Sequence, residues 1–187
     1  MTLIRVTDGP SYYHQRLYAD GQALCKLAGD AEPSYSLSGM LYASSTGWIM
    51  LKVPNALVQG VFAAMDEHGV ELPPSGPENS LNAHISVMRP EEVELIGGID
   101  KITERGKRYN YRIGGLVTVT PAGWPEMNQV WMLRVHSPEL QALRRSYGLT
   151  SLPNNNKFSF HITVAVRRKG VLGRNETSKA TGVDDDD

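Results

Sequence analysis

The chain has a single cysteine and no long apolar run, and each absence excludes a class of protein. One cysteine, Cys25, among 187 residues rules out an internal disulfide framework and is typical of a reducing compartment. We interpret it as a small buried apolar residue. No apolar stretch approaches the roughly 18 residues of a membrane span, and the first ten residues do not look like an export leader. The sequence therefore predicts a cytoplasmic protein without a membrane partner.

Excess charge of either sign is also missing. The net charge is −1, and it would be +3 without the four terminal residues Asp184 to Asp187. Nucleic-acid-binding surfaces usually carry a dense basic patch, and no such patch is visible here. An anionic ligand must therefore be bound by a local site. The sequence names no protein partner.

Metal-binding patterns are absent from the sequence as well. It contains no His-Glu-x-x-His, no Cys-x-x-Cys and no clustered Asp/Glu pattern that would complete a metal site with the histidines. Zinc in proteins normally takes three or four nitrogen, sulfur or carboxylate ligands. We therefore expect no metal and no other cofactor.

The remaining composition, 41% apolar and 21% charged, is that of an ordinary globular domain or of two small lobes that share a core. Residues 1–46 form an N-terminal arm that we expect to be partly irregular, with one short helix around Gln15 to Ala28. Residues 47–168 form the main domain. Residues 169–187 are polar and acidic, and we predict that they are disordered.

The first part of the main domain alternates between strand and helix signals. Trp48 to Val53 and Leu81 to Met88 are strand-like. Between them, Asn55 is a candidate cap for a helix over Ala56 to His68. A short helix then begins at Pro90 and stops at a pair of glycines.

The second part repeats this order. Tyr109 to Val119 and Val130 to Val135 are strand-like, Ser137 caps a helix, and Phe158 to Val166 is the last strand. The layout is an internal duplication that is not visible as residue identity. It predicts an α+β fold of two pseudo-symmetric lobes, with antiparallel sheets forming a central cleft.

The last strand of each half carries the same short pattern. His84-Ile85-Ser86-Val87 and His161-Ile162-Thr163-Val164 each place a hydroxyl residue two positions after a histidine. Successive side chains of a strand point to opposite faces, so the histidine and the hydroxyl share one face, about 6.6 Å apart. This spacing suits two groups that hold one tetrahedral anion. The other three histidines, which we interpret as surface or structural residues, are His14, His68 and His136.

These motifs resemble those of the 2H phosphoesterases, which include the LigT-like cyclic phosphodiesterases. Members of that family carry two His-x-Thr/Ser-x motifs, one in each of two pseudo-symmetric lobes. The resemblance covers about residues 47–168. Two positions depart from the family pattern, because Ser86 stands where many members have threonine and Phe160 where members often have proline. The compact layout also resembles a viral branch of the family, the phage anti-CBASS enzymes, for which the compartment would be the host cytoplasm.

The resemblance implies a metal-independent phosphodiesterase acting on nucleotide phosphodiesters, either 2′,3′-cyclic phosphate ends of RNA or cyclic (oligo)nucleotides. It implies that His84 and His161 act as general base and general acid, which suits an imidazole pKa of about 6.5. Ser86 and Thr163 would donate hydrogen bonds to the non-bridging oxygens. Which histidine is the base stays open at this point.

Four further residues are candidates for substrate binding. Trp124 lies in a polar loop and could stack on a base, while Lys157 and Arg167 flank the second motif and could contact phosphate. Tyr12 lies in the N-terminal arm, which could fold over the cleft. A packing or surface role is the alternative for each of these residues.

Three other interpretations of the whole pattern stay open. The strands could simply present histidine and hydroxyl side chains to solvent. The protein could instead be a non-catalytic RNA- or nucleotide-binding module on the same fold. The arm and the acidic tail also leave room for an adaptor or virion-associated module.

Overall fold

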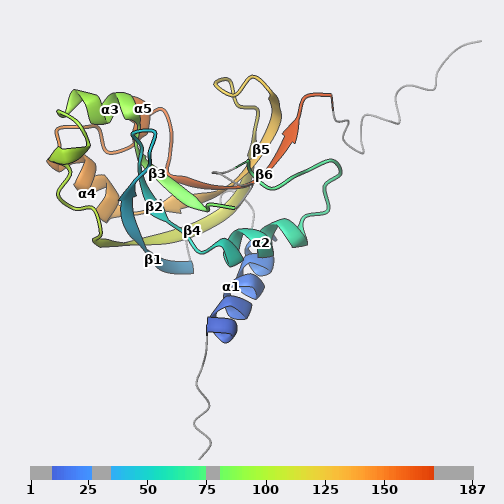
Figure 1. The fold of residues 1–187 in the computed structure, drawn as a ribbon. Helices are drawn as coiled ribbons and strands as arrows, with labels where there is room; N and C mark the ends of the chain where they lie inside the picture. Colours follow the sequence, from blue (N-terminus) through green and yellow to red (C-terminus); the bar gives the residue numbers. More distant parts are fainter. Residues whose placement is uncertain (1–9, 27–34, 75–80, 171–187) are drawn as a thin grey trace, which may run out of the picture.

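Six strands form one closed antiparallel barrel in the order β1-β2-β3-β6-β5-β4 (Figure 1). The computed structural model describes residues 10–26, 35–74 and 81–170. The strands are β1 Tyr35–Ala43, β2 Ile49–Lys52, β3 His84–Met88, β4 Arg108–Val119, β5 Met127–His136 and β6 His161–Arg168. The helices are α1 Pro10–Leu24, α2 Asn55–Ala64, α3 Pro90–Leu95, α4 Pro138–Ser146 and α5 Pro153–Asn156, with a 3-10 turn, η2, at Ile99–Lys101.

The barrel is built from two similar halves. The first half runs β1-β2-α2-β3 and the second runs β4-β5-α4-β6. The halves meet where β1 pairs with β4 and where β3 pairs with β6, and both pairings are antiparallel. The predicted α+β class with antiparallel sheet is therefore confirmed, and so is the duplicated layout.

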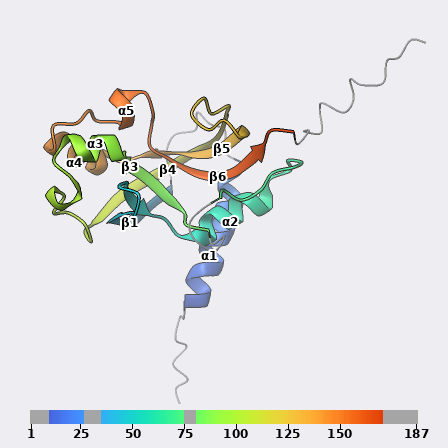
Figure 2. The same cartoon turned by 45° about the horizontal axis from the view of Figure 1, so that its top comes forward.

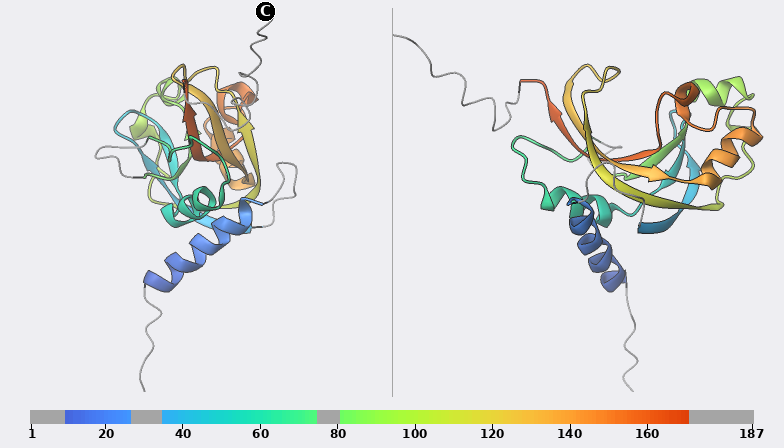
Figure 3. Two further views of the ribbon diagram at one scale, coloured as in Figure 1. Left: turned by 90° about the vertical axis from the view of Figure 1, so that its right-hand side faces the viewer. Right: turned by 180° about the vertical axis from the view of Figure 1, so that it is seen from behind.

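The core lies on the inner side of β3 and β6, as the alternation in the sequence predicts. Ile85, Val87, Ile162 and Val164 are fully buried, whereas the histidine and hydroxyl residues between them are only partly buried. The strong curvature of β4, β5 and β6 around this core is visible from behind in Figure 3. Period-two patterning thus decides which side chains of these two strands can meet a ligand.

Helices cover two separate parts of the barrel. α3, α4 and α5 gather at one end, and α1 packs against α2 elsewhere on the surface (Figures 1 and 2). Ser137 caps α4 as predicted, because its hydroxyl accepts a hydrogen bond from the Leu140 amide. None of the helices in the described residues is long and apolar enough to cross a membrane.

Asn55 has a different role from the predicted one. The residue that caps α2 is Pro54, and Asn55 is the first residue of the helix. The Asn55 side chain instead donates to the Leu81 carbonyl and accepts from the Ala83 amide. It therefore holds the segment that leads into β3, immediately before the first histidine.

The N-terminal region is more regular than predicted. α1 is a 15-residue helix, and β1 is a barrel strand that pairs with both β2 and β4. The barrel therefore includes β1, which precedes the predicted domain start at residue 47. At the other end β6 stops at Arg168, and the predicted disordered tail lies, apart from Lys169 and Gly170, outside the described residues.

Candidate active site

The two histidine motifs lie side by side where β3 pairs with β6. The register places Ile85 opposite Ile162. One residue to either side, the antiparallel pairing sets His84 opposite Thr163 and Ser86 opposite His161. Directly opposed residues have Cβ atoms about 4.5–5.5 Å apart, and diagonal neighbours about 7–8 Å apart. The four motif side chains therefore form a square, with the imidazoles on one diagonal and the hydroxyls on the other.

Both imidazoles are fixed by the same local hydrogen bond. Nδ1 of His84 lies 2.7 Å from the Asn82 carbonyl oxygen, and Nδ1 of His161 lies 2.9 Å from the Ser159 carbonyl oxygen. A carbonyl can only accept, so each Nδ1 carries the hydrogen. Each Nε2 is then left to accept a proton when the ring is neutral and to donate one when it is charged.

The two histidines differ in their surroundings. Burial lowers the pKa of His161 below its usual range, and the nearby charge of His84 lowers it further, while the hydrogen bond to Ser159 acts in the opposite direction. The neutral form of His161 is therefore favoured at neutral pH.

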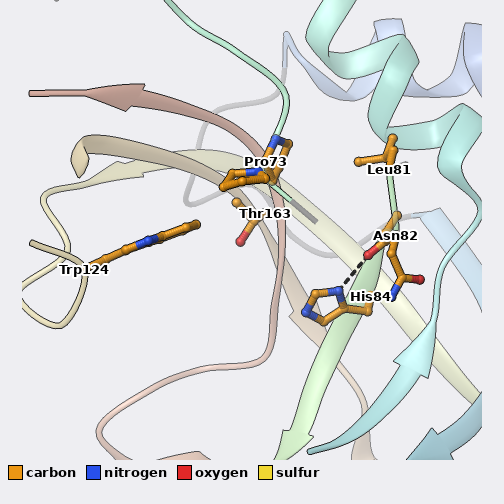
Figure 4. Close-up of a pocket in the computed structure, with 8 residues that line it drawn as sticks. Pro73, Leu81, Asn82, His84, Trp124 and Thr163 are labelled. Atoms are coloured by element: carbon orange, nitrogen blue, oxygen red, sulfur yellow. Dashed lines mark hydrogen bonds between the residues drawn. The ribbon is translucent and has the colours of Figure 1, made fainter. Parts of the chain in front are cut away.

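A pocket opens beside the square of motif residues and contains a predicted substrate-binding side chain. Figure 4 shows His84, Thr163 and Trp124 around it. Trp124 is partly buried, and its indole nitrogen donates to the Glu126 carboxylate at 2.7 Å. This hydrogen bond is made by the edge of the Trp124 ring and holds the ring in place. The other residues of the wall are Pro73, Pro74, Leu81, Asn82 and Ala83.

Arg167 does not fit its predicted role in substrate binding. Its side chain is 6% exposed, and its guanidinium lies 4.9 Å from the centre of the Trp131 ring. It also pairs with Glu67 at 2.9 Å and donates to the His68 carbonyl and to Gln129. These contacts attach β6 to the segment after α2, which contradicts the prediction that Arg167 binds substrate.

The other two candidates lie away from the pocket lining. Lys157 is exposed at the end of α5 and does not line the pocket, so its role stays a prediction. Tyr12 lies in α1, and its side chain is outside the described part of the structure. The α1 helix packs on α2, and none of its described side chains lines the pocket, so the idea of a lid stays a prediction.

Sequence reasoning missed the residues that orient the histidines. Asn82 and Ser159 act through their backbone carbonyls, which every residue type possesses. No sequence signal could have identified them. Among the residues that the structure describes, no group of three or more His, Cys, Asp or Glu side chains could hold a metal ion.

Comparison with known families identifies this arrangement. Residues 47–172 match the family model described as Swiss Army Knife, 2H phosphoesterase domain. The chain belongs to the 2H phosphoesterases. No curated protein and no solved structure matches it. The resemblance drawn from the two motifs is therefore confirmed, and the match supports a phosphoesterase function in general.

The family match covers the part of the chain that carries both motifs. The matched segment contains β2 to β6 and therefore all four motif side chains, together with the pocket and Trp124. It does not contain α1 or β1. The family match does not name the substrate of this 2H phosphoesterase. The substrate has to be inferred from the residues around the square.

Proposed function

We propose that the protein is a metal-independent phosphodiesterase that hydrolyses nucleotide phosphodiesters, with His84 and His161 as its acid–base pair. The substrate class comprises 2′,3′-cyclic phosphate ends of RNA and cyclic mono- or oligonucleotides. The observation that carries the proposal is the square formed across β3 and β6, in which each imidazole is held by Nδ1 and keeps Nε2 for proton transfer.

The lowered pKa of His161 supports the role of general base for this residue. Its neutral Nε2 removes a proton from the attacking water as the new phosphorus–oxygen bond forms. Protonated His84 gives its Nε2 proton to the departing oxygen as the old bond breaks, so the proton balance closes within the pair. Ser86 and Thr163 donate hydrogen bonds to the non-bridging oxygens, where negative charge increases.

Trp124 supports a nucleotide as the substrate. Its ring lines the pocket together with His84 and Thr163, so a group attached to the scissile phosphate can extend toward it. An aromatic face stacks on any base, and such stacking contributes about 1–3 kcal/mol per base. The nucleoside would then lie in the pocket while the phosphate lies over the square.

Replacing either histidine tests the proposal. Each well-placed general acid or base contributes roughly 10²- to 10⁴-fold to rate. We expect His84→Ala and His161→Ala each to lower kcat by at least 10²-fold on whichever member of a panel wild type cleaves, with chelator present. The panel contains 2′,3′-cyclic mononucleotides, cyclic dinucleotides and cyclic trinucleotides. Thermal unfolding should stay within a few degrees of wild type, because both side chains are only partly buried and lie outside the barrel core.

The rival hypothesis is a binding module without catalysis. It predicts nucleotide binding without turnover, and phosphate contacts that are insensitive to histidine protonation. A bell-shaped dependence of kcat/KM on pH that persists with EDTA would exclude it. Full activity of the double variant His84→Ala/His161→Ala would instead exclude the two-histidine mechanism.

A further inference from the structure

The prediction that the duplication is not visible as residue identity is wrong for the strands that flank the square. Met-Leu-Lys-Val at Met50–Val53 corresponds to Met-Leu-Arg-Val at Met132–Val135. The two segments occupy equivalent positions, because β2 pairs with β3 in the first half and β5 pairs with β6 in the second. Both pairings also carry a β-bulge at the same place, where the extra residue is the one that follows the motif hydroxyl, Val87 in β3 and Val164 in β6.

This register sets one cation beside each catalytic histidine. Lys52 is paired with His84, and Arg134 is paired with His161. Directly paired side chains lie on the same face of a sheet, with Cβ atoms about 4.5–5.5 Å apart. Both cations are exposed, whereas Leu51, which precedes Lys52 on β2, is fully buried. The two charges therefore lie on the same face of the sheet as the square.

The positions of the two cations are related by the same pseudo-twofold arrangement as the histidines. Lys52 and Arg134 lie on β2 and β5, with β3 and β6 between them. Three strand spacings of about 4.8 Å separate their backbones by roughly 14 Å across the strands, and two residues separate them by about 6.6 Å along the strands, so they lie on opposite sides of the point where the scissile phosphate would lie. A single phosphate held at the centre by Ser86 and Thr163 already has its hydrogen-bond donors. Lys52 and Arg134 are therefore placed to bind further anionic groups on the two sides of this phosphate.

We infer that Lys52 and Arg134 bind the phosphates on the two sides of the scissile diester. The preferred substrate is then an oligonucleotide with at least three successive phosphates, such as a cyclic trinucleotide, in which every diester has a phosphate neighbour on each side. This inference rests on the proposed function and names the substrate class within it. The lysine ammonium acts as a point charge and the arginine guanidinium as a planar donor, and both bind phosphate.

Lys52→Met and Arg134→Met test the inference, because methionine keeps an unbranched side chain and removes the charge. The quantity to measure is the ratio of kcat/KM for cyclic triadenylate to kcat/KM for 2′,3′-cyclic AMP. We expect each variant to lower this ratio at least tenfold, mainly through the KM of the trinucleotide. Lys52→Arg should keep the ratio within threefold of wild type. Lys107→Met removes an exposed cation outside β2 and β5 and should leave the ratio unchanged. An unchanged ratio in both methionine variants overturns the inference.

A binding measurement separates this inference from the proposed function. Cyclic triadenylate is titrated calorimetrically into His84→Ala/His161→Ala, with and without Lys52→Met or Arg134→Met. We expect each added change to raise Kd at least tenfold and to make log Kd depend less steeply on log salt concentration, because each change removes one charged contact with phosphate. This result supports the inference even if wild type cleaves nothing, which would refute only the proposed function. An unchanged Kd and slope overturns the inference.

Discussion

At the residue scale, the two histidines have matching positions and different surroundings. Each follows a carbonyl that fixes its Nδ1, and each lies opposite a hydroxyl residue of the other motif. The pKa of His161 is lowered first by burial and then by the charge of His84. This asymmetry supports the proposed division of the acid and base roles between two residues that the duplicated sequence makes look equivalent.

The pKa of His161 should rise when His84 is replaced by alanine. The substitution removes a neighbouring positive charge and opens the site to water, and both changes favour the protonated imidazole. In wild type the titration midpoint of His161 should lie below about 6.5. In His84→Ala it should move upward, as measured by the histidine carbon-bound proton shifts in NMR. A downward movement would contradict the electrostatic coupling and with it the assignment of His161 as base.

The hydroxyl residues of the motifs should matter for kcat and little for stability. Ser86 and Thr163 share the solvent side of β3 and β6 with the histidines. Removing one preorganised donor to a developing oxyanion costs about 10²–10³ in kcat. We expect losses of this order in Ser86→Ala and Thr163→Val, with Ser86→Thr active because it keeps the hydroxyl. Equal activity of Ser86→Ala and wild type would show that the hydroxyl does not contact the phosphate.

At the scale of elements, α1 and α2 approach each other closely through two glycines. A Cβ atom on Gly60 would lie 2.0 Å from the Tyr18 carbonyl oxygen, and one on Gly21 would lie 2.2 Å from the Leu57 carbonyl oxygen. Real Cβ atoms do not come this near to backbone oxygens, so the helices can touch only where side chains are absent. This contact is what attaches α1 to the folded unit.

Gly60→Ala should therefore destabilise the protein without damaging the site. Overpacking of this kind costs typically 1–3 kcal/mol, since the helices must move apart. The expected result is a loss of that size in the free energy of unfolding, measured with urea, while kcat per folded molecule stays as in wild type. Gly123→Ala is the matched control, because a Cβ there has no neighbour within 4 Å. A loss as large in the control would show that the helix contact is not the cause.

The elements also show what sequence reasoning could reach. The strands around both motifs and the cap of α4 at Ser137 were predictable, because period-two burial and a capping hydroxyl are local signals. β1 was not, since Gly39 and two serines interrupt its apolar pattern and its partners β2 and β4 come later in the chain. The left-handed backbone of Asn154 to Asn156 was not predicted either. Recognising that Lys52 and Arg134 hold equivalent positions beside the two histidines required the pairing register of four strands.

At the scale of the whole molecule, Arg144 of α4 joins the two halves at the end of the barrel where α3, α4 and α5 gather. It is fully buried, and its guanidinium binds both carboxylate oxygens of Glu92 at 2.7 and 2.9 Å. It also donates to the Val87 carbonyl of β3, and to the carbonyls of Thr150 and Leu152 in the segment before β6. One side chain from the second half thus holds α3 and β3 of the first half next to the strand that carries His161.

Glu92→Gln should weaken this junction in a pH-dependent way. Burial raises the pKa of the Glu92 carboxyl, but the Arg144 hydrogen bonds and charge, with the amides of Arg89 and Asn154, outweigh it and leave the pKa below its usual range. A carboxyl with a depressed folded-state pKa contributes stability that is present above its unfolded value of about 4.3 and is lost as pH falls through the folded value. Removing one partner of a buried pair costs about 3–5 kcal/mol.

Urea unfolding of wild type and Glu92→Gln at a series of pH values checks this prediction. The difference in free energy of unfolding should be about 3 kcal/mol at pH 7, should stay near that value down to about pH 4.3, and should shrink below it as Glu92 of wild type becomes protonated. Glu91→Gln is the matched control, since it makes the same charge change on a side chain that is 66% exposed and pairs with Arg89 at the surface. The control should differ from wild type by no more than about 0.5 kcal/mol. Equal losses in the two variants would show that the stability comes from net charge, and that the Arg144 junction does not hold the halves of the barrel together.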